Sequence, residues 1–231
     1  MRATRLMWVL GLAAASWLAG VPSAWAGVPG HVAGYSEVAS SNPNQTAATT
    51  IVVPRLSCTG VPPTGFQEVF AGVRIDTASG VTIVGVNLEC SPRPLYRAVM
   101  EVNGTSVPVD LSVLPGDTVT ASASESATAT EVTLVDGGEM QTGTGPGASV
   151  TAEDVGGMAV NCSGPACTPV PHTRVTRYSA STIDGLSLTG ASQGDIVDAA
   201  SATEMTSTVL HGAGHAFSVH WVSSCGTSGV C

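Results

Sequence analysis

The chain has 231 residues, a formal net charge of −9 and no lysine. An acidic chain repels phosphate backbones, so this charge gives nucleic-acid binding no electrostatic support. The length fits one all-β domain of about 200 residues preceded by a short leader.

The first 26 residues have the features of a secretory signal peptide. Arg2 and Arg5 precede an apolar run over residues 6–21, and the small-x-small motif Ser-Ala-Trp-Ala follows at residues 23–26. The apolar run is shorter than the roughly 20 residues that a membrane span needs, so we expect cleavage after Ala26 rather than an uncleaved anchor. The expected product is a secreted domain, residues 27–231, with no membrane segment.

Six cysteines remain after the predicted signal peptide, and an even number in an exported chain predicts disulfides. Short spacing favours Cys162–Cys167 and Cys225–Cys231 as local loops, which leaves Cys58–Cys90 as the third pair. The sequence alone does not fix this connectivity. A zinc site is disfavoured because no CxxC pair is present and the compartment is oxidising. We therefore expect no metal and no other cofactor.

The rest of the chain alternates with a period of two and shows no helical periodicity. Short alternating runs lie between clusters of Gly, Pro and Asn, as in β-sandwiches and barrels. Residues 141–147 are interpreted as a glycine-rich loop. We expect strands near residues 34–39, 48–54, 68–76, 81–89, 95–102, 118–124, 128–135, 149–155, 174–178, 187–188, 203–209 and 215–222.

Two of these runs can be assigned face by face, because successive side chains of a strand point to opposite sides. Val84, Val86 and Leu88 share one face and are expected to lie in the core. If the two strands pair, the opposite face is either an ordinary solvated face or, where the sheet is concave, a cleft. That face carries Ile83, Asn87, Glu89, Arg97, Val99 and Glu101.

Short motifs occur along the chain in a definite order. They are GY at 34–35, TIVVP at 50–54, FAGV at 70–73, VGVN at 84–87, YRAVME at 96–101, LPGDTV at 114–119, RVTRY at 174–178 and FSVHW at 217–221. Their order and spacing resemble those of the glutamic peptidases, or eqolisins, which are secreted acid endopeptidases. The resemblance covers most of residues 32–222 and implies an all-β fold, a concanavalin-like antiparallel β-sandwich of jelly-roll type.

The resemblance also implies where the chemistry should lie. In that family a Glu activates water as the general base, and a Gln helps to hold the water and the oxyanion. The position that matches the Gln is Ile83, whose side chain has neither donor nor acceptor. The Glu has two possible registers, which place either Gly157 or Glu153 at its position. Val99 and Met100 stand where the family has Trp and Tyr.

Three readings of function follow. The leading one is a secreted glutamic-peptidase-like protein that has lost the Gln–Glu pair and binds peptide or glycan in the former cleft. The second is an active acid endopeptidase with a rearranged carboxylate pair, Glu153 and Glu101, because carboxylates a few ångströms apart can share a proton. The third is a structural or adhesive extracellular protein, with a filled or flat face in place of a cleft.

Overall fold

The computed structural model describes residues 31–59, 61, 65–91, 93–162, 167–197 and 202–223. The predicted signal peptide and the predicted Cys225–Cys231 pair lie outside these residues. All regular elements of the described part are strands, and none of it is a helix long and apolar enough to cross a membrane. The strands are β1 His31–Val38, β2 Asn44–Val52, β3 Gln67–Thr77, β4 Gly80–Cys90, β5 Pro94–Val102, β6 Thr105–Val107, β7 Thr118–Ser126, β8 Ala129–Asp136, β9 Glu139–Pro146, β10 Val150–Met158, β11 Val175–Ile183, β12 Ser192–Val197, β13 Thr203–Ser207 and β14 Phe217–Trp221.

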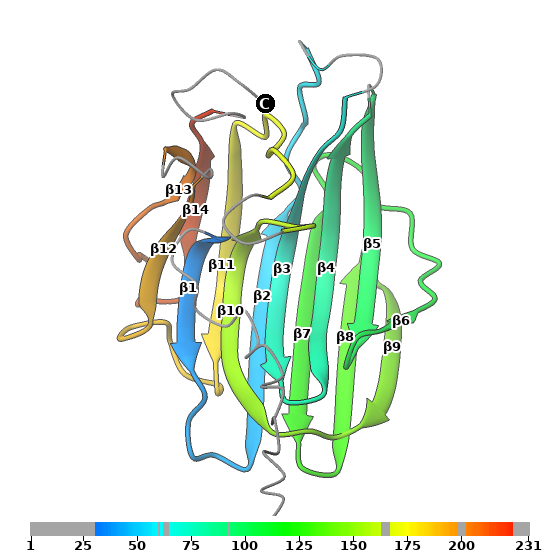
Figure 1. Cartoon of the computed structure of the whole chain (residues 1–231), viewed down its shortest axis with the longest axis vertical. Coiled ribbons are helices and arrows are strands. Elements are labelled where there is room, and N and C mark those ends of the chain that lie inside the picture. Colours follow the sequence, from blue (N-terminus) through cyan, green and yellow to red (C-terminus); the bar gives the residue numbers. More distant parts are fainter. Residues whose placement is uncertain are drawn as a thin grey trace, which may run out of the picture.

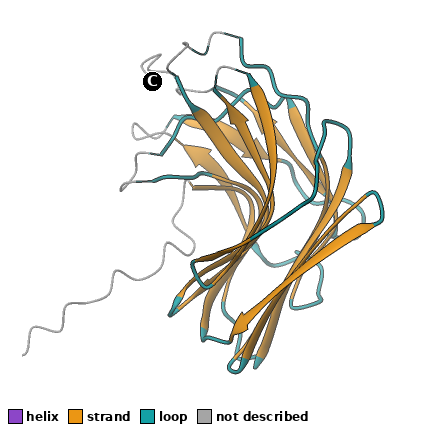
Figure 2. Ribbon diagram, turned by 90° about the vertical axis from the view of Figure 1, so that its right-hand side faces the viewer, coloured by secondary structure: helices purple, strands orange, loops and turns teal. Residues whose placement is uncertain are grey.

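These strands form one continuous antiparallel sheet, in the order β6-β5-β4-β3-β10-β1-β12-β13-β14-β11-β2-β7-β8-β9. The sheet folds over so that β5, β4, β3, β10 and β1 form a first layer. This layer packs against β9, β8, β7, β2, β11 and β14 of the second layer (Figure 1). The curved layers face each other when the molecule is turned by 90° (Figure 2). The predicted all-β antiparallel sandwich is confirmed.

The core lies between the two layers and is built from the alternating side chains of both. Val84, Val86 and Leu88 of β4 are at most 1% exposed, as their alternation predicted. Val119 of β7 and Leu134 of β8 are fully buried members of the same core cluster. Burying a side chain of this size stabilises the fold by about 1.5–3 kcal/mol, so this face fixes the register of the strands.

A row of glycines crosses five neighbouring strands of the sheet. The register places them side by side in the order Gly194, Gly34, Gly156, Gly72 and Gly85. A Cβ on Gly34 would lie only 2.2 Å from the Val155 carbonyl oxygen, and Gly72 and Gly85 would meet similar contacts. No Cβ fits at these glycines, so the strip carries no side chains of its own on the face of the first layer that points away from the core. We call this face the outer face.

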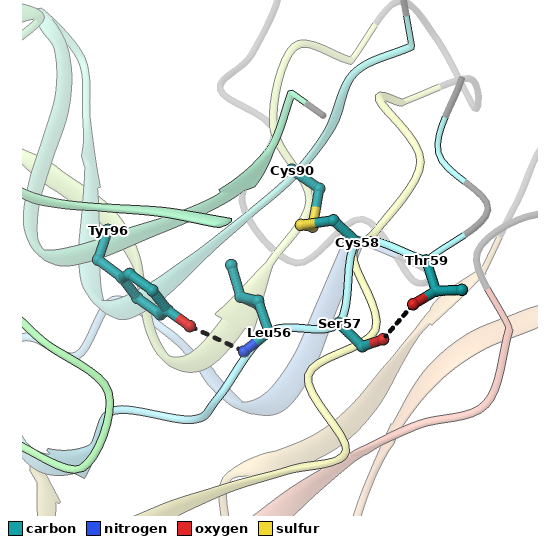
Figure 3. Close-up of a disulfide and its surroundings, with 6 residues drawn as sticks. All are labelled: Leu56, Ser57, Cys58, Thr59, Cys90 and Tyr96. Atoms are coloured by element: carbon teal, nitrogen blue, oxygen red, sulfur yellow. Dashed lines mark hydrogen bonds between the residues drawn. A yellow bond between two sulfur atoms is a disulfide. The ribbon is translucent and has the colours of Figure 1, made fainter. Parts of the chain in front are cut away.

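Two of the predicted disulfides are present, Cys58–Cys90 and Cys162–Cys167. Figure 3 shows that Cys58–Cys90 ties the segment after β2 to the end of β4. The Tyr96 hydroxyl accepts a hydrogen bond of 2.8 Å from the Leu56 amide beside it. The disulfide and this bond hold one segment against the edge of the first layer. The third pair stays a prediction.

The glycine-rich segment expected as a loop is instead a strand. β9 pairs with β8 along its whole length, from Ala129↔Pro146 to Asp136↔Glu139. A Cβ on Gly145 would lie 2.5 Å from a methyl group of Val102, so the glycine permits close packing against β5 rather than a turn. The strand expected at residues 187–188 does not form. The strand β12 was not expected, because only its last two residues, Ile196 and Val197, are apolar.

Candidate functional site

The outer face of the first layer carries most of the predicted site residues, in rows set by the strand register. One row lies on each side of the bare glycine strip. The first row contains Val32, Met158, Phe70, Asn87 and Arg97. The second row contains Ser36, Asp154, Arg74, Ile83 and Glu101.

The structure brings Ile83, Asn87, Arg97, Val99 and Glu101 onto this one face. Ile83 of β4 is paired with Arg74 of β3 on one side and with Glu101 of β5 on the other. Val99 is paired with Gly85, at the end of the glycine row. The position that matches the family's Gln therefore lies on the outer face, between a cation and an anion.

Glu153 and Gly157 lie on the opposite side of the sheet, contrary to expectation. Their partners on β3, Ile75 and Ala71, are core residues. A Cβ on Gly157 would point between the layers, where its nearest neighbours are Val219 at 3.7 Å and the Tyr178 hydroxyl at 3.8 Å. Because the sheet separates Glu153 from Glu101, the two carboxylates do not form the pair that the second reading requires.

The acid of β10 that lies on the outer face is Asp154, which the sequence reasoning missed. Its side chain is 1% exposed, and burial raises its pKa to about 6. The nearby Ser36 hydroxyl and the Arg74 charge lower this pKa in part, although neither carboxylate oxygen has a hydrogen-bond partner of good geometry among the described residues. The sequence held no sufficient signal for this, because Glu153 and Asp154 are both polar; the pairing of β10 with β3 puts Asp154, and not Glu153, on the same face as Met158.

Arg74 is held by an acid of its own strand. Its Nε and Nη2 atoms donate to one oxygen of Asp76, at 2.9 and 2.6 Å, and Asp76 is almost fully buried. Burial and, to a smaller extent, the Arg74 charge lower the pKa of His31. The charge of Arg74 is therefore balanced by Asp76, and Arg74 also lies near His31 and Asp154.

A pocket of about 320 Å³ opens beside Ile83 and Glu101. Its apolar wall includes Phe70 and Met158, which form a small cluster separate from the main core, with Ile83 packed against it. The Phe70 ring lies over Gly72, since a Cβ there would be 2.6 Å from the ring. The ring can lie there because Gly72 has no side chain. The pocket is lined by His31, Phe70, Arg74, Val81, Ile83, Glu101, Met158, Ala159, Val160, Asn161 and Cys162.

A polar network at the far end of the outer face holds the loop after β10. Asn87 donates to Glu68 and, at 3.3 Å, to Glu89, and Asn161 donates to Glu68 at 2.8 Å. Arg97 forms an ion pair of 3.3 Å with Glu89. Burial raises the pKa of Glu89, while Arg97 lowers it and Glu68 raises it. Through Asn161, this network fixes one wall of the pocket.

One group of described residues brings metal-binding atoms close together. The ligand atoms of His31, Cys162 and Cys167 lie within 4.8 Å of one another. Both sulfurs belong to the Cys162–Cys167 disulfide and so are not thiolates, the form of cysteine that binds metals. This group is not a metal-binding set while the disulfide is intact.

The comparisons with known proteins connect this geometry to a fold. No family model and no curated protein matches the sequence. Scytalido-glutamic peptidase, solved with a transition state analog inhibitor, has a TM-score of 0.65 and 16% identity over 84% of this chain and 98% of its own. SCP-B, an eqolisin solved with the tripeptide Ala-Ile-His, has a TM-score of 0.62 and 17% identity over the same shares. The chain therefore has an eqolisin-like fold, as its motifs predicted.

Proposed function

We propose that the protein is a secreted peptide-binding protein that uses the outer-face pocket and does not hydrolyse peptides by the glutamic-peptidase mechanism. The observation that carries this proposal is Ile83. It lies on the outer face between Arg74 and Glu101, at the position that matches the family's Gln, and it offers no hydrogen bond to a water or an oxyanion.

The loss of catalysis follows from what amide hydrolysis requires. A base must take a proton from water, and positioned donors must stabilise the oxyanion; removing one such donor costs about 10²–10³ in rate. Glu153 and Gly157, the two positions matched to the family's Glu, point toward the core. Two acids remain in the row. Asp154 is almost fully buried and lies two strands away from Ile83, and Glu101, the register partner of Ile83, lies three strands away from Asp154, so the two carboxylates do not form a pair.

Binding is supported by the shape and chemistry of the pocket. A concave, mostly apolar site with a few polar groups is typical of ligand binding, and a flat structural face would lack it. Two eqolisin-like structures were solved with peptide-derived ligands, the tripeptide of SCP-B and the peptide-based transition state analog of scytalido-glutamic peptidase. We favour peptide over glycan because sugar hydroxyls would be buried against Phe70, Met158 and Ile83 without partners, which is unfavourable.

The test has a catalytic part and a binding part. The secreted protein is incubated at acid pH with a denatured protein substrate, beside the variant Asp154→Asn; we expect no cleavage by either. Cleavage by the unmodified protein that Asp154→Asn abolishes would overturn the catalytic part of the proposal.

For binding, a pool of blocked pentapeptides that vary at the central residue is passed over the immobilised protein. We expect retention that is lost in Ile83→Trp, which fills the pocket. The matched control is Glu131→Trp, on an exposed position of β8 in the second layer, and it should retain the pool. No retention, or equal retention by Ile83→Trp, would overturn the binding part.

A further inference from the structure

We propose that the pocket selects a lysine or arginine side chain of the bound peptide, and that Glu101 is the residue that determines this specificity. The inference rests on the proposed function and adds the chemistry of the ligand to it.

Glu101 is the uncompensated charge of the pocket. Its side chain is partly exposed, it lines the pocket, and its register partner is Ile83. Within the described residues, the ion pairs join Arg74 to Asp76 and Arg97 to Glu89, and Glu101 takes part in neither. A carboxylate at the mouth of an apolar pocket is a site at which a cation from outside gains both an ion pair and a charge-assisted hydrogen bond.

The other charged groups around the pocket do not replace that cation. Arg74 already gives two hydrogen bonds to Asp76 and forms its ion pair with that residue, not with Glu101. His31 is buried, and its lowered pKa favours the neutral ring. Asp154 lies on the side of Arg74 away from Ile83, and Asp76 is the ion-pair partner of Arg74, so neither supplies a cation to Glu101. An anionic side chain would therefore meet more acids than bases here.

The walls of the pocket match the rest of such a side chain. Lysine and arginine pack their methylene stems against apolar surface and keep the charged end near water. Ile83 lies beside Glu101 in the register, and Phe70 and Met158 supply further apolar wall. When the methylene stem of the ligand's lysine or arginine packs on Ile83, the cationic end of that side chain lies close to Glu101. The net charge of −9 also favours the approach of cationic ligands.

The experiment measures the affinity of single peptides, Ac-Ala-Ala-Xaa-Ala-Ala-NH₂, by calorimetry at low ionic strength. Xaa is lysine, arginine, norleucine or glutamate. We expect lysine and arginine to bind about tenfold more tightly than norleucine, the scale of one hydrogen bond to a charged group, and glutamate to bind most weakly. In Glu101→Gln the preference for lysine over norleucine should fall to about twofold or less. Glu131→Gln, the matched control on β8, should keep it.

A cation can also come from the amino terminus of a peptide. A norleucine peptide without the acetyl group tests this source, and we expect it to bind no better than the acetylated one. If it binds as tightly as the lysine peptide, the side-chain assignment is overturned. Equal binding of lysine and norleucine that Ile83→Trp still abolishes would overturn this inference and leave the proposed function standing. If no peptide binds, both this inference and the binding part of the proposed function are overturned.

Discussion

Glu153 and Asp154 are consecutive residues of β10, and the sheet places their carboxyl groups on opposite sides. Glu153 points between the layers, and Asp154 points to the outer face. Each is 1% exposed. Burial, with the nearby Asp184, Glu37 and Asp154, raises the pKa of Glu153 to about 8; burial raises that of Asp154 to about 6. Both groups hold their protons in the folded protein well above the pH at which an unfolded chain would release them.

This relationship predicts that the fold is most stable in acid. Between pH 4.5, the ordinary pKa of Glu, and about pH 8, the folded state keeps a proton on Glu153 that the unfolded state has lost. The contribution of this proton to the free energy of unfolding is therefore complete below pH 4.5 and is lost as the pH rises toward 8. Each pKa unit corresponds to about 1.4 kcal/mol, so the total loss is of the order of a few kcal/mol.

The measurement is the free energy of unfolding in urea from pH 4 to pH 8, for the unmodified protein and for Glu153→Gln. The variant keeps a neutral side chain at every pH, so its stability should fall much less over this range. Glu131→Gln, on an exposed position of β8, should follow the unmodified protein. Identical slopes for the unmodified protein and Glu153→Gln would show that Glu153 does not titrate in this way.

Two consecutive glycines of β10 predict opposite responses to alanine. Gly156 has a φ of 154°, and a Cβ there would lie 2.5 Å from the Ala33 carbonyl oxygen, so Gly156→Ala should destabilise the protein by about 2–4 kcal/mol. A Cβ on Gly157 meets nothing closer than 3.7 Å, so Gly157→Ala should be neutral or stabilise by up to about 1 kcal/mol. Urea midpoints of the two variants check this, and the reverse order would refute the placement of β10.

The disulfide between Cys58 and Cys90 should contribute strongly to stability. It closes a loop with a sequence separation of 32, for which chain entropy gives about 3–4 kcal/mol. The double variant Cys58→Ser/Cys90→Ser should lose about this much in urea unfolding. The matched comparison is Cys162→Ser/Cys167→Ser, whose separation of 5 predicts a smaller loss of about 2 kcal/mol. Equal losses would argue against the entropic origin of the difference.

Asn161 should matter for the pocket more than for the fold. Its side chain donates to Glu68 at 2.8 Å from an exposed loop position that lines the pocket. Asn161→Ala should weaken peptide binding by about twofold to fivefold and change the free energy of unfolding by about 1 kcal/mol or less. Calorimetry and urea unfolding on the same samples separate the two effects. Asn44→Ala, an exposed position at the start of β2, is the control.

The sequence by itself determined the fold class and the two faces of β4, and its cysteine spacing favoured the two disulfides that are present. Val84, Val86 and Leu88 are apolar, and Asn87 on the alternate positions is polar, so a period of two is enough to decide which side is buried. The cysteine spacing and the order of the motifs also depend on the chain alone, and both predicted the structure correctly for the described residues.

Only the tertiary structure decided which acid belongs to the outer face. Glu153 and Asp154 are both polar, so alternation along β10 gives no sign of which one is turned inward; the pairing of β10 with β3 sets this. In the same way, Gly143 and Gly145 of β9 indicate a loop in sequence, but in the fold they make room for Val107 and Val102. Side-chain direction and close packing depend on the neighbouring strand, and a single segment does not contain that information.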